Sequence, residues 1–551
     1  MSFPSHTSVF NFSATFRFLL LCGCAVAGQT VSIDPGQQLQ KFEGWGTSLC
    51  WWAVSTGAWS EEARNELIGA IVDPDTGLGY TCFRYNIGGG DDPAHTHLSG
   101  ERAVPGFKPT ENGAYDWDAD PYQRNILLSL AARNNQCIFE AFSNSPPWWM
   151  TISGCASGNT NGADNLKPEY FPAFADYLAT VAEHYRNTWG IHFRTVTPFN
   201  EPSSGYWKPE GGQEGCGFKN RQSEMVVELG RKLREKNIFP ATSISAADET
   251  SLEHTVTSLN VYSDSALFYL SQINSHSYSG WSFRDDVQAL AQKLGKNLWQ
   301  SESGPLSKND NSDVTMWMSQ VIIQDLRLMQ PNAWLDWQVC DQHPDWRSIE
   351  INNTTQRFVY NKRYYMHAAF SRFIRPGAQF IYSSDTNSVA AIDSATGNLI
   401  VVLRNGANRT TDYTLDLSKC NSLGTTAQIH RFALPGSLTR ESDLQVSDNR
   451  ITVSTPAQTV TTCVIPAEDT PVKKTANRLA GTSINITYRA GELSVDFVSG
   501  VPYRLHLYNL SGKRVYTTSD RTLQIALPEG LYIAELQEST RIVRTVVVSR
   551  R

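Results

Sequence analysis

The feature that most constrains the fold is a regular alternation of strand-like and helix-like segments between residues 42 and 340. Helix-compatible stretches such as 169–188, 221–236 and 313–329 separate short β-rich runs. Eight such runs are found, at 42–49, 82–88, 137–144, 194–200, 242–247, 273–278, 297–302 and 333–339. Strands that alternate with helices form parallel sheets, and eight repeats over about 300 residues predict a closed (β/α)8 TIM barrel.

An open doubly wound sheet is the alternative architecture for this pattern. A nucleotide-binding loop in such a sheet leads from a strand directly into a helix. Gly88-Gly89-Gly90 follows a strand candidate, but the chain continues into DDPAHTH, which has no helical pattern. The barrel is therefore favoured, and we expect no organic cofactor.

The texture of the sequence changes after Phe373, where short strand-like runs are separated by Gly, Asn, Asp and Pro. This pattern predicts an attached antiparallel β-sandwich domain over 373–466, beside a barrel that occupies 42–372. The segment 28–41 is also strand-like, and we expect it to return to the sandwich as an extra edge strand.

Residues 467–480 are polar, with Pro and Lys, and predict a linker to a small C-terminal β-sandwich module at 481–551. The pattern LYNLSGKRVY…LPEGLYIAEL…TVVV in that module resembles the C-terminal sorting domain of proteins exported by type IX secretion in Bacteroidetes. The resemblance implies the export machinery as a partner. An Ig-like spacer or a carbohydrate-binding module is the alternative, although the module contains no Trp as a sugar platform.

The N-terminus has the pattern of an export signal. Arg17 precedes the apolar run 18–27, which ends in Ala25-Val26-Ala27 and predicts a signal peptide over residues 1–27. The run is too short to span a bilayer, which takes about 20 residues. We expect a protein that is secreted, or held at the bacterial cell surface or in the periplasm. A lipid anchor at Cys24 is the alternative, because residues 21–24 weakly resemble a lipoprotein cleavage box.

Eight cysteines remain after the signal, at 50, 82, 137, 155, 216, 340, 420 and 463. They form no CxxC pair and no cluster with His at zinc spacing, so we expect no metal site. Cys155 and Cys216 both lie in Gly-rich loops and are the first candidates for a disulfide. The alternative is that most of the cysteines are buried thiols.

The charge balance excludes some partners. The chain has 47 Lys and Arg against 54 Asp and Glu, a net charge of −7, so nucleic acid is not an expected partner. No run after the signal reaches 18 apolar residues, so we expect no membrane span. We expect the protein to be a monomer.

Two glutamates stand where a barrel carries its catalytic groups, at the carboxyl ends of strands. Glu201 ends the fourth predicted strand within Thr-Pro-Phe-Asn-Glu-Pro, and Glu302 ends the seventh within Trp-Gln-Ser-Glu-Ser-Gly. Strands four and seven face each other across the mouth of an eight-stranded barrel. A carboxyl pair in that arrangement predicts glycosidic cleavage, with one proton donor and one nucleophile. Either glutamate alone would be read as a surface charge.

The neighbours of this pair predict its surroundings. Arg84 and Tyr278, at the ends of strands two and six, are expected to supply a cation and a donor beside Glu302. Asn200 is suited to a sugar 2-hydroxyl. His276 is a candidate substrate contact, although a hydrogen-bonded core pair with Tyr278 is slightly preferred. Glu140 and Asp336 lie nearer the middle of their strands and are expected to be structural.

Tryptophan is the other unusual feature. All 15 Trp residues lie between Trp45 and Trp346, and several follow predicted strand ends. Because flat rings stack on the apolar faces of sugars, such a cluster predicts a carbohydrate cleft. The candidate platforms are Trp52, Trp149, Trp207 and Trp337.

Taken together, these stretches resemble glycoside hydrolase family 30. The motifs that carry the resemblance are FEGWGTS at 42–48, RYNIGGG at 84–90, SPPWWM at 145–150, FNEP at 199–202, QSESG at 300–304 and PAQTVTT at 456–462. The match covers roughly residues 30–466. It implies a retaining enzyme with Glu201 as acid/base and Glu302 as nucleophile, and a side domain built from both ends of the catalytic region.

Within that family, WGTSLCWWA, SNSPPWWMTISG and YWKPEGGQEGC are most similar to endo-β-1,6-galactanases, which act on galactan side chains of arabinogalactan. The resemblance therefore implies a polysaccharide substrate. β-1,6-Glucanase, β-xylanase and glucosylceramidase-like activities are alternatives within the family. A non-catalytic glycan-binding protein on a hydrolase scaffold is an alternative of another class.

Overall fold

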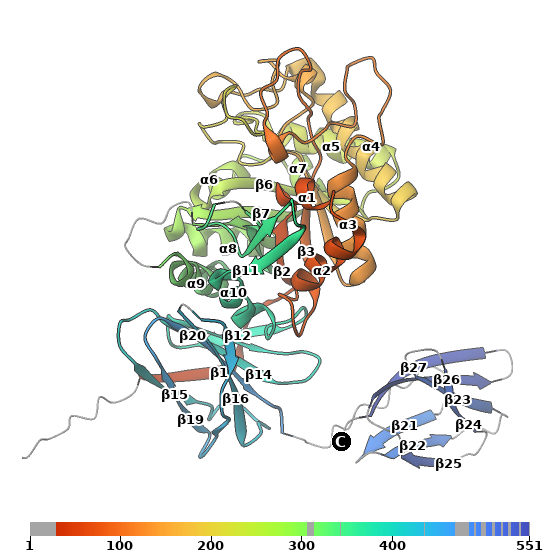
Figure 1. Ribbon diagram of the computed structural model, residues 1–551, viewed down its shortest axis with the longest axis vertical. Helices are drawn as coiled ribbons and strands as arrows, with labels where there is room; N and C mark the ends of the chain where they lie inside the picture. The colour runs from red at the N-terminus through yellow and green to blue at the C-terminus, as the bar shows by residue number, and fades with distance from the viewer. Residues whose placement is uncertain are drawn as a thin grey trace, which may run out of the picture.

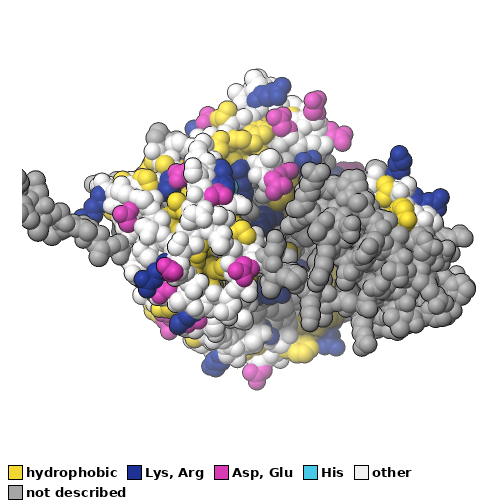
Figure 2. All heavy atoms as spheres, turned by 90° about the horizontal axis from the view of Figure 1, so that it is seen from below, with side chains coloured by type: hydrophobic (Ala, Val, Ile, Leu, Met, Phe, Trp, Pro, Cys, Tyr) yellow, Lys and Arg dark blue, Asp and Glu magenta, His cyan; other side chains and the backbone are white. Residues whose placement is uncertain are grey.

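The computed structural model describes residues 29–305 and 313–468 except 342 and 435, and, from 484 onward, seven strands and Lys513. The predicted signal peptide, the lipid-anchor alternative at Cys24 and most of the predicted linker lie outside the described residues. Within them, no helix is both long and apolar enough to cross a bilayer. Acidic and basic side chains are interspersed on the face that Figure 2 presents.

Eight parallel strands close into a barrel, which confirms the predicted fold class (Figure 1). Neighbouring strands follow the order of the sequence, and β9 pairs with β2 to close the ring. The strands are β2 (Gly44–Ser48), β3 (Cys82–Asn86), β4 (Ile138–Phe142), β5 (Phe193–Thr197), β6 (Ser243–Ser251), β7 (Leu270–Ser279), β8 (Asn297–Ser303) and β9 (Ala333–Gln338). Each overlaps one of the eight predicted runs.

Helices follow the barrel strands and cover the outside of the ring (Figure 1). They bury apolar faces, such as Phe174, Leu178 and Val181 of α4, in one continuous core. The α-helices are α1 (Trp52–Thr56), α2 (Glu61–Val72), α3 (Pro121–Arg133), α4 (Phe171–Trp189), α5 (Gln222–Glu235), α6 (Leu252–Leu259), α7 (Asp264–Tyr269), α8 (Arg284–Leu294), α9 (Val314–Gln324) and α10 (Lys362–Ser371). A short hairpin of β10 (Ile349–Asn352) and β11 (Arg357–Tyr360) precedes α10.

A second domain is a large sheet below the barrel in Figure 1. Its strands from the second part of the chain are β12 (Gln379–Ser383), β13 (Ser388–Ile392), β14 (Leu399–Asn405), β15 (Thr411–Asp416), β16 (Thr426–Ala433), β17 (Leu438–Arg440), β18 (Leu444–Gln445), β19 (Arg450–Thr455) and β20 (Thr459–Ile465). The N-terminal strand β1 (Gln29–Lys41) joins them.

The expectation that this N-terminal segment forms an edge strand is wrong. β1 lies inside the sheet, antiparallel to β12 on one side and parallel to β15 on the other. Val31 and Ile33 are buried in the apolar core of this domain, so the strand is covered and not peripheral. The parallel pair also makes the sheet mixed, where the sequence predicted a purely antiparallel one.

The two domains are joined by side chains that bond to backbone atoms of the other domain. Arg327, which follows α9, donates to the carbonyl oxygens of Ser383 and Ser388 at 2.9 Å each. Arg404 of β14 donates to the carbonyl of Met316 and to the hydroxyl of Ser319, both in α9. Buried contacts of this kind fix the sheet domain against one side of the barrel.

The C-terminal part of the chain contains two antiparallel sheets. One consists of β21 (Ile484–Arg489), β22 (Glu492–Phe497) and β25 (Thr522–Ala526). The other consists of β23 (Tyr503–Asn509), β24 (Arg514–Thr518), β26 (Gly530–Glu538) and β27 (Arg541–Ser549). The turn at Leu510-Ser511-Gly512 between β23 and β24 lies outside the described residues.

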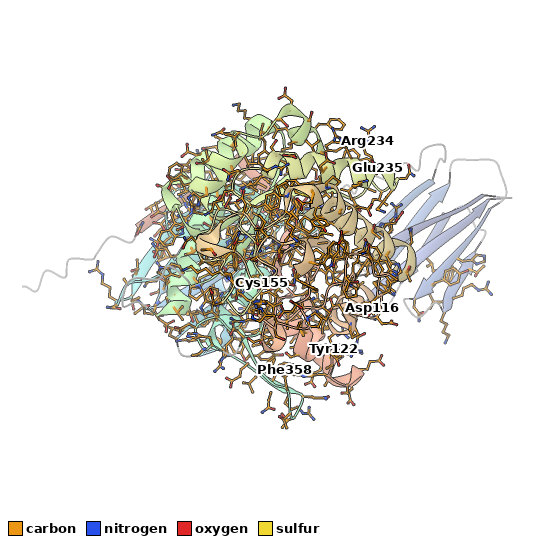
Figure 3. The ribbon with its side chains drawn as sticks, turned by 90° about the horizontal axis from the view of Figure 1, so that it is seen from above. Asp116, Tyr122, Cys155, Arg234, Glu235 and Phe358 are labelled. Atoms are coloured by element: carbon orange, nitrogen blue, oxygen red, sulfur yellow. The ribbon has the colours of Figure 1, made fainter. Side chains whose placement is uncertain are left out.

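None of the eight cysteines between residues 29 and 468 forms a disulfide. The proposed Cys155–Cys216 pair is therefore wrong in this structure. Both thiols are buried in adjoining loops, where burial raises the pKa of Cys216 to about 12. Figure 3 places Cys155 near the middle of the molecule as seen from above. These residues behave as small apolar side chains, which is the alternative given above.

Candidate active site

Glu201 and Glu302 come together at one end of the barrel. Glu201 lies just after β5, and Glu302 is the penultimate residue of β8. Both are about 4% exposed. One oxygen of each carboxylate and one ring nitrogen of His276 lie within 4.8 Å of one another. Two acidic groups so close and so little hydrated cannot easily both be ionised, so the pair is built to share a proton.

The backbone at Glu201 is held in an unusual conformation, with a φ of 50°. Its N–H donates to the carbonyl of Asp248 at 2.8 Å, and its own carbonyl accepts from the indole N–H of Trp207 at 2.9 Å. Pro202 follows and cannot continue a strand ladder. The left-handed residue therefore turns the chain at the rim and fixes where the carboxylate points.

Glu302 accepts two hydrogen bonds that favour its ionised form. The hydroxyl of Tyr278 donates to Oε1 at 2.9 Å, and Nη1 of Arg84 donates to Oε2 at 3.2 Å. The sequence predicted both partners beside Glu302, and the structure brings them there. Among the described residues, one side chain bonds to the carboxylate of Glu201: Nδ1 of His276 lies 3.0 Å from it.

Arg84 is fully buried among acidic groups. Besides Glu302, its guanidinium bonds to Glu140 at 3.0 Å and to Asp248, and it lies over the ring of Phe142. Glu140 in turn accepts from Thr195, Ser245, Gln272 and Asn274, which satisfies its remaining lone pairs. Glu140 is thus an interior carboxylate, as is Asp336, which pairs with Arg363.

His276 occupies the centre of the site. Its Nδ1 lies 3.0 Å from Glu201 and 3.5 Å from Glu302, while Nε2 lies 3.2 Å from Asp248. The ring packs at 5.9 Å from that of Tyr278, so it is both the expected core neighbour of Tyr278 and a partner of the carboxyl pair.

Asp248 is the main residue that sequence reasoning missed. It follows the predicted strand at 242–247 directly, with a φ of 56°. It contacts Arg84 and His276, and the Ser301 hydroxyl donates to it at 2.7 Å. Its position at a strand end was a usable signal, because that is where the other site residues were found.

The charges in the cluster follow from these contacts. Burial would raise the pKa of Asp248, but Arg84 and His276 hold it at about 2. Burial would lower the pKa of His276, but Glu302 and Asp248 outweigh it and raise that pKa to about 10. His276 is therefore a cation and Asp248 an anion at neutral pH.

The pKa of Glu302 is raised to about 7, mainly by burial. Glu201 and Asp248 add to this shift, and the positive charges of His276 and Arg84 oppose it. Near neutrality Glu302 can therefore gain or lose its proton, although it is almost completely buried.

The predicted binding residues divide into accessible and buried ones. Asn200 directly precedes Glu201 and is buried, and its Oδ1 has no hydrogen-bond partner within the described part of the chain. Trp149 and Trp337 are half-buried; Trp149 donates to the carbonyl of Lys108, and Trp337 packs edge-on against Trp51.

Two predicted platforms are corrected. Trp52 is about 1% exposed, and its indole N–H donates to the carbonyl of Ser48, so it belongs to the core between β2 and α1. Trp207 is also buried and supports the backbone of Glu201. Neither presents a ring face to a ligand in this structure.

The buried carboxylate of Glu214 explains the glycine triplet. It accepts from the side chain of Asn86 and from the backbone N–H of Gly89, both at 2.7 Å. The turn at 88–90 therefore binds this protein's own carboxylate. Burial raises the pKa of Glu214 to about 8.

Within the described residues, one group of side chains has the spacing of a metal site: Glu201, His276 and Glu302. The positive charges of His276 and Arg84 already compensate these carboxylates, and His276 would have to lose its proton to bind a cation. The cluster is therefore better suited to proton transfer than to metal binding.

Comparison with known proteins agrees with this geometry. Residues 28–278 match the model of O-Glycosyl hydrolase family 30. An endo-beta-1,6-galactanase of Hypocrea rufa is 30% identical over 422 residues, which cover 73% of this chain and 86% of the relative. An exo-beta-1,6-galactobiohydrolase of Bifidobacterium longum subsp. longum is 25% identical over 73% of this chain, although the match covers only 36% of that larger protein.

The fold of this chain is also similar to that of a solved structure. The catalytic domain of GH30 xylanase C from Talaromyces cellulolyticus superposes with a TM-score of 0.64 at 18% identity, covering 80% of this chain and 100% of that chain.

Replacing Asp248 by Asn tests the charge cluster. The change leaves the buried guanidinium of Arg84 with one fewer anionic partner, and we expect it to lower the free energy of unfolding by about 3 kcal/mol. Chemical denaturation followed by tryptophan fluorescence measures the change. The control is Glu228→Gln, which removes a surface ion pair with Arg231 and should cost less than about 0.5 kcal/mol. Equal stability of the two variants would show that Arg84 does not depend on Asp248.

Proposed function

This chain belongs to glycoside hydrolase family 30, and we propose that it is a secreted, retaining endo-glycosidase that hydrolyses β-1,6-linked galactan. The observation that carries the proposal is the approach of Glu201 and Glu302, whose nearest site oxygens lie within 4.8 Å. Retaining glycosidases hold their two carboxyl groups about 5–5.5 Å apart, whereas inverting ones need about 6.5–9.5 Å to admit a water.

The surroundings of each carboxyl group support its role. Glu302 is the proposed nucleophile, because Arg84 and Tyr278 donate to its oxygens and stabilise the anion. Glu201 is the proposed acid/base, because it lacks such donors apart from His276 and must exchange a proton in each step.

The reaction then proceeds by double displacement. Glu302 attacks the anomeric carbon and forms a glycosyl ester while the bond to the leaving oxygen breaks, and Glu201 gives that oxygen its proton. Glu201 next takes a proton from water, the water oxygen attacks the same anomeric carbon, and the ester bond to Glu302 breaks. Asn200, directly before Glu201, is the proposed donor to the sugar 2-hydroxyl.

Galactan is the proposed substrate because the galactanase of Hypocrea rufa is similar over most of both chains. β-1,6-Glucanase, β-xylanase and glucosylceramidase-like activities are the alternatives, and the Bifidobacterium longum relative makes exo-action a further one. Product profiling on β-1,6-galactan, β-1,6-glucan, xylan and glucosylceramide decides between them. Internal cleavage of galactan yields a ladder of oligosaccharides, and exo-action releases one short product.

A non-catalytic glycan-binding protein is the candidate of another class. The charged site argues against it, because a binding site has no need of two carboxyl groups that share a proton. Incubation with arabinogalactan decides the question: new reducing ends support the enzyme, and binding without new reducing ends supports the alternative.

We also propose that the enzyme acts outside the cytoplasm as a monomer. The N-terminal signal pattern supports export, and the C-terminal pattern that resembles a type IX sorting domain supports passage through that machinery.

Substitution of the two carboxyl groups separates their roles. Glu302→Gln should reduce kcat by at least about 10⁴-fold, because no ester can form. Glu201→Ala should retain slow action on aryl glycosides, whose leaving groups need no proton, and azide should restore turnover by replacing water. Full activity of Glu302→Gln would refute the assignment, and azide rescue of that variant alone would reverse the two roles.

The pH profile tests the contact between Tyr278 and Glu302. The hydroxyl of Tyr278 stabilises the Glu302 anion, so Tyr278→Phe should raise the pKa of that carboxyl group. The acid limb of kcat/KM should then move to higher pH by about one unit, which corresponds to about 1.4 kcal/mol. Tyr122→Phe, an exposed position in α3, is the control. A shift of the alkaline limb alone would show that Tyr278 acts on Glu201 and not on Glu302.

A further inference from the structure

Tyr206 and Trp207 are neighbours in the loop that follows Glu201, and they lie in opposite environments. Trp207 is about 4% exposed, and its indole N–H donates to the carbonyl of Glu201. Tyr206 is 47% exposed, although its ring centroid lies only 4.6 Å from that of Trp207, at an interplanar angle of 61°. One ring thus supports the backbone of Glu201, and the next is presented to solvent beside it.

The support under Tyr206 is rigid. The loops at 151–165 and 202–217 interlock: the carbonyl of Trp207 accepts from the N–H of Asn159, and the N–H of Gly215 donates to the carbonyl of Ala156. A Cβ at Gly215 would lie 2.0 Å from the ring of Trp207, and one at Gly158, whose φ is 134°, would lie 2.2 Å from its backbone. Trp207 is therefore closely packed on two sides, and it gives the ring of Tyr206 a fixed surface to pack against.

The side of the scissile bond on which Glu201 acts indicates which sugars could contact this exposed ring. Under the proposed function, Glu201 protonates the oxygen of the leaving group, so the sugars on that side of the cut must lie next to Glu201. Tyr206 belongs to the loop that carries Glu201, and its ring packs against Trp207, whose indole N–H donates to the carbonyl of Glu201. Aromatic rings offer large, rigid apolar area to the flat faces of sugars.

We propose that Tyr206 is the platform for the leaving-group sugars, and hence the residue that favours cleavage within a galactan chain over release of a small terminal group. The inference rests on the proposed function. It transfers to Tyr206 the role that the sequence suggested for Trp207. Binding energy from such a remote contact is used to orient the scissile bond, so its loss lowers the rate for substrates that have leaving-group sugars.

A comparison of two substrates tests the platform. Tyr206→Ala should lower kcat/KM on β-1,6-galactohexaose by about tenfold, and leave kcat/KM on nitrophenyl β-1,6-galactobioside within about twofold of wild type. The aryl substrate has no sugar on the leaving-group side, so only the first substrate should respond. Tyr206→Trp should keep activity on both substrates.

The control is Tyr122→Ala, which removes an equally exposed tyrosine from α3, near the periphery in Figure 3. It should leave both substrates unaffected. Equal loss on both substrates in Tyr206→Ala would show that the change merely disturbs Glu201, and no loss on either would show that Tyr206 touches no sugar; both results overturn the inference.

The proposed function is tested separately, by the activity of the wild-type protein on the four substrates named above. If wild type cleaves β-1,6-glucan or xylan in place of galactan, the substrate assignment fails, and Tyr206→Ala is compared on the hexaose and aryl glycoside of that polymer with the same expected ratio. If wild type cleaves none of them, the proposed function and the platform fail together.

Discussion

The buried guanidinium of Arg84 is the interaction on which the site depends. It bonds to Glu140, Asp248 and Glu302, which lie on three different barrel strands. A lone cation could not be removed from water at acceptable cost, and neither could three carboxylates. Each therefore requires the others, and together they tie β4, β6 and β8 to Arg84 of β3.

The same cluster sets the protonation of the reacting pair. Glu302 and Asp248 keep His276 charged, and His276 lies between Glu201 and Glu302. Its positive charge opposes the rise that burial imposes on the pKa of Glu302. The site thereby keeps Glu302 able to ionise near neutrality, although this carboxyl group is nearly excluded from water.

Much of the fold could be predicted from the sequence, because barrel strands carry a local signal. All eight strands were recognisable as short β-rich runs, and Glu201 and Glu302 could be paired because strand ends meet at one face of a barrel. Arg84 and Tyr278 followed from the same rule. The order of strands in the second sheet could not be predicted, since the pairing of β1 with β12 and β15 depends on contacts across some 350–380 positions.

The burial of individual side chains could not be predicted from the sequence either. Trp52 and Trp207 have the residue type and the position expected of sugar platforms. The neighbouring sequence, however, does not distinguish a ring packed under a loop from one exposed above it. Asp248 was missed because an acidic residue after a strand is common, and its meaning comes only from Arg84 and His276 at the ends of other strands.

The anomeric configuration of the first product tests the central claim most directly. Two carboxyl groups this close leave no space for a water between nucleophile and sugar, so the account requires an ester intermediate and two inversions. Proton NMR of a β-linked galactan digest should show the β-anomer at the new reducing end first, with the α-anomer appearing only by mutarotation. Initial release of the α-anomer would contradict the account.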